Sequence, residues 1–103
     1  MYHKLVRDKI PNIIRDNGEV PIVKILDHDQ YKEELEKKLM EECQEVLDAT
    51  GYDRIMELAD LLEVMISLSE LENKTLDDIN FAREQKKNER GGFSERLFLE
   101  DVK

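Results

Sequence analysis

Two pairs of acidic residues stand at mirrored positions on either side of Gly51. Glu42 and Glu45 lie nine and six residues before this glycine, and Glu57 and Asp60 lie six and nine residues after it. The two members of each pair are three residues apart, so their carboxylates share one face of a helix. If the chain turns back at the glycine into two antiparallel helices, we expect Glu45 to face Glu57 and Glu42 to face Asp60.

The apolar residues around these acids predict where the carboxylates point. Glu42 falls inside an apolar stripe of the first predicted helix, and Glu57 falls within the broad apolar arc of the second. Glu45 and Asp60 lie at the borders of these surfaces. Buried carboxylates are costly unless they are paired or neutralised, and Lys38, one turn before Glu42, can offset one charge at most. A divalent cation therefore explains the cluster better than a solvated helix surface, and oxygen-only ligands favour Mg²⁺, Mn²⁺ or Ca²⁺.

The charge distribution argues against a nucleic-acid partner. The net charge is −9, and Asp27–Asp78 holds 17 acidic and 5 basic residues, whereas the rest of the chain holds 8 and 11. Because nucleic-acid binding needs a basic face, we expect no nucleic-acid partner.

Polar residues interrupt the longest apolar stretch, Leu58–Leu71, so we expect no membrane span. The single cysteine, Cys43, cannot form an internal disulfide, and we expect it in the core of a cytoplasmic protein.

The length and composition predict the fold class. A chain of 103 residues with 40% charged residues, four glycines and two prolines is typical of one all-α domain, spanning residues 1–103. We predict an antiparallel helical bundle with two long central helices, a short N-terminal helix and an extended C-terminal tail. The expected helices cover residues 7–17, 28–50, 53–73 and 75–89. Residues 20–26 read as an extended connector or an edge strand, and the tail from Phe93 to Lys103 is expected to lie across the bundle.

Short-range signals support these boundaries. Asp27 followed by Gln30 fits a capping box at the start of the second helix. Gly51 is expected to end that helix, Asp53 to cap the third, and Thr75 to cap the fourth. The third helix is apolar over more than half its circumference, which is more than one face of a small monomer requires. We therefore expect a homodimer or homotetramer built on that helix.

The acidic pattern resembles that of the MazG-like all-α nucleotide pyrophosphohydrolases, which include phosphoribosyl-ATP pyrophosphohydrolase. That superfamily is marked by E-x-x-E on one helix and E-x-x-D on the next, here Glu42-Cys-Gln-Glu45 and Glu57-Leu-Ala-Asp60. The opening KLVRDKIPNII (Lys4–Ile14) and the Arg90-Gly-Gly-Phe93 element also resemble segments of small stand-alone members. The resemblance spans nearly the whole chain.

The resemblance implies an activity, a metal and a set of site residues. It implies Mg²⁺-dependent hydrolysis of a nucleoside triphosphate between its α and β phosphates, giving a monophosphate and pyrophosphate. Glu42, Glu45, Glu57 and Asp60 are then the metal ligands, with Mn²⁺ as a possible substitute for Mg²⁺. Glu42 or Glu45 is the candidate catalytic base.

The phosphates of such a substrate also need cations. Lys9, Lys38 and Arg90 are our candidates, ranked above Arg7 and the remaining basic residues because two of them lie in the family-like segments. The alternative function is a non-catalytic helical module for nucleotide sensing or protein interaction, favoured by the apolar third helix and by the lack of an evident base-binding residue.

Overall fold

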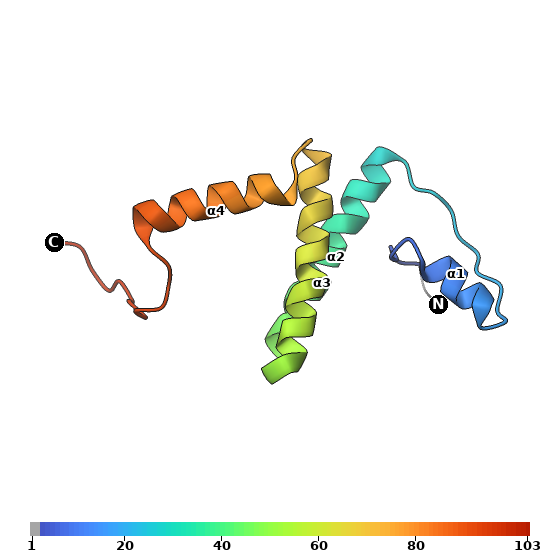
Figure 1. The fold of residues 1–103 in the computed structure, drawn as a ribbon, viewed down its shortest axis with the longest axis horizontal. Helices are drawn as coiled ribbons and strands as arrows, with labels where there is room; N and C mark the ends of the chain where they lie inside the picture. Colours follow the sequence, from blue (N-terminus) through green and yellow to red (C-terminus); the bar gives the residue numbers. More distant parts are fainter. Residues whose placement is uncertain (1–2) are drawn as a thin grey trace.

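A hairpin of two long antiparallel helices forms the centre of the fold. The computed structural model describes residues 3–103, and the four helices in that range follow in the order α1 (Ile10–Asp16), α2 (His28–Asp48), α3 (Gly51–Leu71) and α4 (Leu76–Arg90). α2 and α3 pack side by side along most of their length (Figure 1). No strand occurs among residues 3–103. The predicted fold class, all-α with two long central helices and a short N-terminal helix, is confirmed.

Capping interactions fix where two of the helices begin. The side chain of Asp27 accepts a hydrogen bond from the Gln30 backbone N–H at 2.8 Å, and the Asp27 backbone N–H donates to Gln30 Oε1 at 3.3 Å. This confirms the predicted capping box. At the start of α4, the Thr75 backbone N–H donates to Asp78 Oδ2 at 2.8 Å and holds the pKa of that carboxyl below its ordinary value. Both pairs satisfy N–H groups that would otherwise lack a partner at a helix start.

Two helix boundaries differ from the prediction. α1 begins at Ile10 rather than at residue 7, because Pro11 occupies its first turn, the position in a helix where proline is best tolerated. α3 begins at Gly51, whose φ of +60° is accessible to glycine without strain, so this glycine opens α3 instead of ending α2. Asp53 therefore lies in the first turn of α3, where its negative charge interacts favourably with the positive end of the helix dipole, and does not cap the helix.

The apolar core lies between α2 and α3 and is small. Within the described range, Leu35 of α2 and Val64 of α3 are the buried hydrophobic residues, and Leu35 is only 3% exposed. Cys43 is exposed, so its predicted place in the core was wrong. A single neighbouring helix covers a narrow strip of α2, and Cys43 lies beyond that strip.

α4 and the tail extend away from the hairpin. α4 touches α3 only near its start, and the tail after Arg90 leaves its far end (Figure 1). All side chains of the tail are exposed, so the prediction that it crosses the bundle was wrong. The radius of gyration is 18.0 Å, whereas a compact domain of this length has about 13 Å. Among the described residues, no helix combines the length and the apolar character that a membrane span requires.

We expect Asp27→Ala to destabilise the fold by about 1 kcal/mol, because the first turn of α2 loses its capping side chain. Urea unfolding followed by circular dichroism measures this difference. Asp29→Ala is the matched control, since Asp29 is an acid of the same turn whose side chain accepts no backbone hydrogen bond. An equal effect of both substitutions would contradict a specific capping role.

Candidate metal centre

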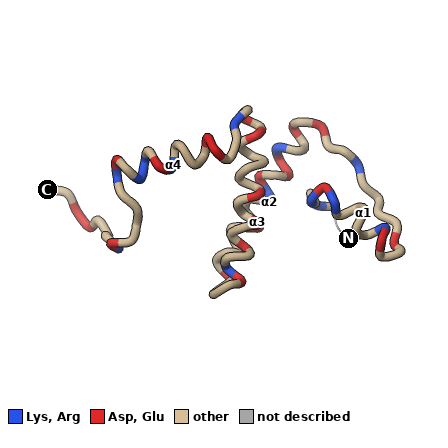
Figure 2. The backbone as a smooth tube through the Cα atoms, viewed as in Figure 1, with Lys and Arg blue, Asp and Glu red and all other residues tan. Residues whose placement is uncertain are grey.

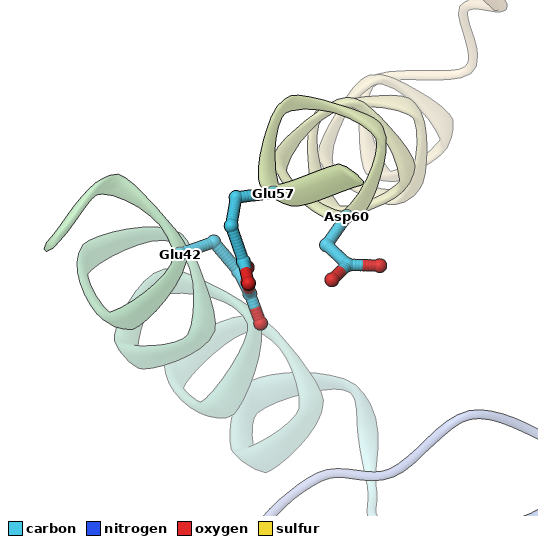
Figure 3. Close-up of side chains that lie close together, drawn as sticks. All are labelled: Glu42, Glu57 and Asp60. Atoms are coloured by element: carbon cyan, nitrogen blue, oxygen red, sulfur yellow. The ribbon is translucent and has the colours of Figure 1, made fainter. Parts of the chain in front are cut away.

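Three of the four predicted carboxylates converge between α2 and α3. One carboxylate oxygen each of Glu42, Glu57 and Asp60 lies within 4.8 Å of the other two. Figure 3 shows Glu42 extending from α2 toward Glu57 and Asp60 on α3. The turn at residues 49–50 places the two helices antiparallel, so the mirrored spacing in the sequence becomes proximity in the fold. The arrangement offers oxygen ligands of the kind that Mg²⁺ prefers.

Two oxygens of this cluster lack the partners that buried polar atoms normally have. Glu42 is only 8% exposed, and within residues 3–103 the Oε2 atoms of Glu42 and Glu57 are inaccessible to solvent and have no hydrogen-bond donor. Buried carboxylate oxygens are almost always hydrogen-bonded, paired with a cation or bound to a metal. The three residues thus fit a set of cation ligands: they offer oxygen atoms, these atoms lie close together, and two carboxylate oxygens have no other partner.

The fourth predicted carboxylate, Glu45, lies beside the cluster and is exposed. It belongs to α2, one turn after Glu42, and it is close enough to affect the titration of both Glu42 and Glu57. The predicted facing of Glu45 and Glu57 therefore matches the structure. Glu45 differs from the other three because it does not belong to the group whose carboxylate oxygens lie within 4.8 Å of one another.

Mutual repulsion and burial raise the pKa values of two carboxyls. Burial is the main cause that raises the pKa of Glu42, followed by a side-chain hydrogen bond with Glu45 and by the charges of Glu45 and Asp60; Lys38 opposes them. The pKa of Glu57 is raised first by a side-chain hydrogen bond with Glu45, then by burial and by neighbouring acidic charges. Both effects disfavour the ionised form, as expected for like charges in a confined space.

One cation contacts the cluster directly. Arg7 Nη2 donates to Asp60 Oδ1 at 2.7 Å, joining the segment before α1 to α3 across 53 positions of sequence. Both side chains remain about half exposed, so the guanidinium keeps further N–H groups free to face solvent beside the cluster. Our ranking from sequence placed Lys9 and Arg90 above Arg7. The signal was present, because Arg7 lies inside the family-like segment Lys4–Ile14.

The three cations predicted to bind phosphate are placed differently. Lys38 lies on α2 one turn before Glu42, where its ammonium is 3.7 Å from Glu41 and its charge lowers the pKa of Glu42. Lys9 is exposed at the start of α1. Arg90 ends α4, which projects away from the hairpin (Figure 1). Lys38 is thus the predicted cation that the fold brings to the acids.

An open hollow adjoins the cluster on the side of the α2–α3 turn. Its volume is about 410 Å³, within the range of small-ligand sites. Four acids line it together with three other residues: Glu45, Asp48, Asp53 and Glu57, with Ala49, Thr50 and Met56. An anionic ligand can occupy such a surface only with cations to offset the repulsion.

We expect the metal-free protein to become more stable as the pH falls from 7 toward 5. Because the pKa values of Glu42 and Glu57 are raised above the ordinary 4.5, the folded state binds protons more readily than the unfolded state in this range. Stability is therefore lost as the pH rises through the raised values. Melting temperatures in EDTA across this range measure the trend, and Glu57→Gln should flatten it. Glu63→Gln, at an exposed acid of α3, is the control and should leave it unchanged; a wild-type trend of opposite sign would contradict the assignment.

The comparisons with known proteins give one partial match. No family model matches the chain, and no solved structure matches it. An uncharacterized protein of Mycolicibacterium smegmatis (strain ATCC 700084 / mc(2)155) is 41% identical over 54 residues, which cover 52% of this chain and 55% of that protein. The chain thus spans about half the length of the relative it matches, and the match assigns no activity.

Proposed function

We propose that the chain is a Mg²⁺-dependent, MazG-like nucleotide pyrophosphohydrolase that cleaves the α–β phosphate bond of a nucleoside triphosphate or related nucleotide, giving a monophosphate and pyrophosphate. The observation that supports it best is the convergence of Glu42, Glu57 and Asp60 with two buried, unpartnered oxygens. These residues belong to an E-x-x-E and an E-x-x-D motif on consecutive helices, and the resemblance of these motifs to those of MazG-like enzymes also supports the proposal. Mn²⁺ would serve the same ligands.

The burial and position of each carboxylate suggest its role in the proposed reaction. Glu42, Glu57 and Asp60 hold the metal, which when bound offsets phosphate charge and makes a bound water more acidic. Glu45 is our choice of general base over Glu42, because it is exposed to solvent water and lies next to two of the ligands. A base must reach the proton that it removes, and the buried Glu42 is already committed to the interior of the cluster.

Arg7 and Lys38 are the cations that we assign to the substrate phosphates. Arg7 already contacts the cluster through Asp60 and can turn its free N–H groups to phosphate oxygens in a bidentate manner. Lys38 adds a point charge one turn from Glu42. The roles of Lys9 and Arg90 stay predictions. We further propose that the enzyme is a homo-oligomer, and that its single cysteine fits the reducing cytoplasm.

A non-catalytic interaction module is the second candidate. The observation that favours it is the large number of exposed apolar side chains, including Leu58 and Leu62 of α3 and Phe81 of α4. Contiguous exposed apolar surface commonly marks a protein interface. Such a module would use the hairpin as a scaffold and would respond little to divalent metal, which separates it from the enzyme.

Metal binding should raise the melting temperature. A ligand that binds only the folded state stabilises it by about 2.7 kcal/mol when its free concentration is 100 times its Kd. We expect millimolar Mg²⁺ or Mn²⁺ to raise the melting temperature in a thermal-shift titration, and EDTA to reverse the gain. Glu57→Gln should abolish the shift, whereas Glu63→Gln should retain it. A flat titration of the wild-type protein would show that the cluster does not bind a divalent metal ion.

Turnover should depend on the same carboxylates. With a panel of nucleoside triphosphates and Mg²⁺, we expect equal amounts of monophosphate and pyrophosphate, resolved by anion-exchange chromatography. Glu57→Gln should lower the rate by about a hundredfold or more, because the metal supplies several kcal/mol of charge stabilisation.

Glu63→Gln is the matched control for turnover, since Glu63 is an exposed acid of α3 outside the cluster and should not be needed. Release of inorganic phosphate alone would contradict cleavage at the α–β bond. Absence of turnover on every nucleotide, together with no response of the protein to divalent metal, would favour the interaction module.

A further inference from the structure

One side-chain contact ties the N-terminal segment to the hairpin. Among the side-chain hydrogen bonds and ion pairs of residues 3–103, only the one from Arg7 Nη2 to Asp60 Oδ1, at 2.7 Å, joins residues 3–26 to α2 or α3. The basic residues of the stretch before α1 lie on its side toward the hairpin (Figure 2). Asp60 also belongs to the carboxylate cluster. The position of the N-terminal segment therefore depends on a residue of the proposed metal site.

Little else holds the N-terminal segment in place. No side chain of residues 3–27 is fully buried, and α1 packs against no other helix of the described chain (Figure 1). α1 has seven residues, fewer than an isolated helix needs to be stable in water. The backbone N–H of Ile10, the first residue of α1, donates to the carbonyl oxygen of Arg7 at 3.1 Å. The residue that holds Asp60 thus also fixes the start of α1.

The cluster can accept more positive charge than Arg7 supplies. Glu42 is only 8% exposed and extends toward the other two carboxylates, and its buried Oε2 has no hydrogen-bond donor in the part of the chain that the structure describes (Figure 3). The guanidinium of Arg7 carries a single charge, and its hydrogen bond is to the half-exposed Asp60. A divalent cation among the three carboxylates would carry twice that charge and could contact the buried oxygen.

Arg7 and a divalent cation make conflicting use of Asp60. An Mg²⁺ ion lies about 2.1 Å from its oxygen ligands, so an ion on Oδ1 would lie within about 5 Å of Arg7 Nη2. Like charges at this separation repel, and both would draw on the single negative charge of Asp60. We propose that Arg7 and the divalent metal ion compete for Asp60, so that metal binding releases Arg7 together with the N-terminal segment. This inference rests on the proposed function, since it takes the cluster as the metal site.

The competition acts in both directions. Metal binding weakens the hold of Arg7 on Asp60, and Arg7 weakens metal binding by the same factor. Because an exposed ion pair has a closed-to-open ratio of about one to five, Arg7 weakens metal binding about two- to sixfold. The released guanidinium has all of its N–H groups free for the phosphate oxygens of a nucleotide. Arg7 thus becomes available to an anion when the metal is bound.

Calorimetric titration of the full chain with Mn²⁺ tests the competition. We expect Arg7→Gln to lower the Kd for Mn²⁺ about two- to sixfold, because the competing cation is removed and the carboxylate of Asp60 is kept. Arg15→Gln is the matched control, since it removes the same charge from the same segment. Arg15 donates to Asn12 within α1, so its loss should leave the Kd at the wild-type value.

Hydrogen exchange measured by mass spectrometry gives a second readout, which a long-range effect of charge would not change. With saturating Mg²⁺, we expect the amides of α1 to exchange about two- to sixfold faster, because the segment is released. The amides of α2 and α3 should exchange more slowly, because the metal stabilises the hairpin. In Arg7→Gln, the amides of α1 should exchange fast both with and without Mg²⁺.

The outcomes separate this inference from the proposed function. A higher or unchanged Mn²⁺ Kd of Arg7→Gln would overturn the competition and leave the metal site standing, as would α1 exchange that Mg²⁺ slows or does not change. An equal decrease of the Kd in Arg7→Gln and Arg15→Gln would also overturn it, because a general effect of charge would then be sufficient. Absence of Mn²⁺ binding to the wild-type protein would overturn the metal site itself, and this inference with it.

Discussion

The repulsion among carboxylates held between α2 and α3 is the constraint on which the structure depends. The hairpin has two buried apolar residues, Leu35 and Val64, and it sets Glu42 into the same interface. A position that could have added to the core therefore carries an ionisable group whose pKa is raised by that burial. Stability is reduced there, because burial and neighbouring acids disfavour the ionised form of that group. Such a conflict between local function and packing is common at sites that bind ligands.

The same constraint explains the environment of the cluster. Acids line the hollow beside Glu57, while Arg7 supplies positive charge beside Asp60 and Lys38 supplies it near Glu42. A site of this polarity attracts cations first and accepts an anion only together with them. The proposed substrate, a nucleotide carried with Mg²⁺, has this combination of charges.

Much of this arrangement could be predicted from the sequence. The mirrored spacing about Gly51 and the apolar neighbours of Glu42 and Glu57 predicted a cluster of four carboxylates, because a helix fixes the face on which each residue lies, and three of the four converge. Asp27 and Gln30 marked the start of α2 for the same local reason. The use of these acids as metal ligands remains a prediction.

Contacts between distant segments were not predictable in this way. The Arg7–Asp60 ion pair depends on where the first residues of the chain return to the hairpin, and no periodicity encodes that path. The exposure of Cys43 and the direction of the tail depend on how many neighbours each helix finds. A helical wheel assigns a face to each residue, but it does not say whether the fold of one chain covers that face.

The half-exposed ion pair between Arg7 and Asp60 has a kinetic consequence. Exposed pairs of this kind contribute about 0–1 kcal/mol, which corresponds to a closed-to-open ratio of no more than about five. Asp60 therefore spends an appreciable fraction of its time without its arginine, and side-chain rearrangements of exposed residues take picoseconds to nanoseconds. The carboxylate of Asp60 thus becomes free of its arginine far more often than diffusion delivers a solute to it.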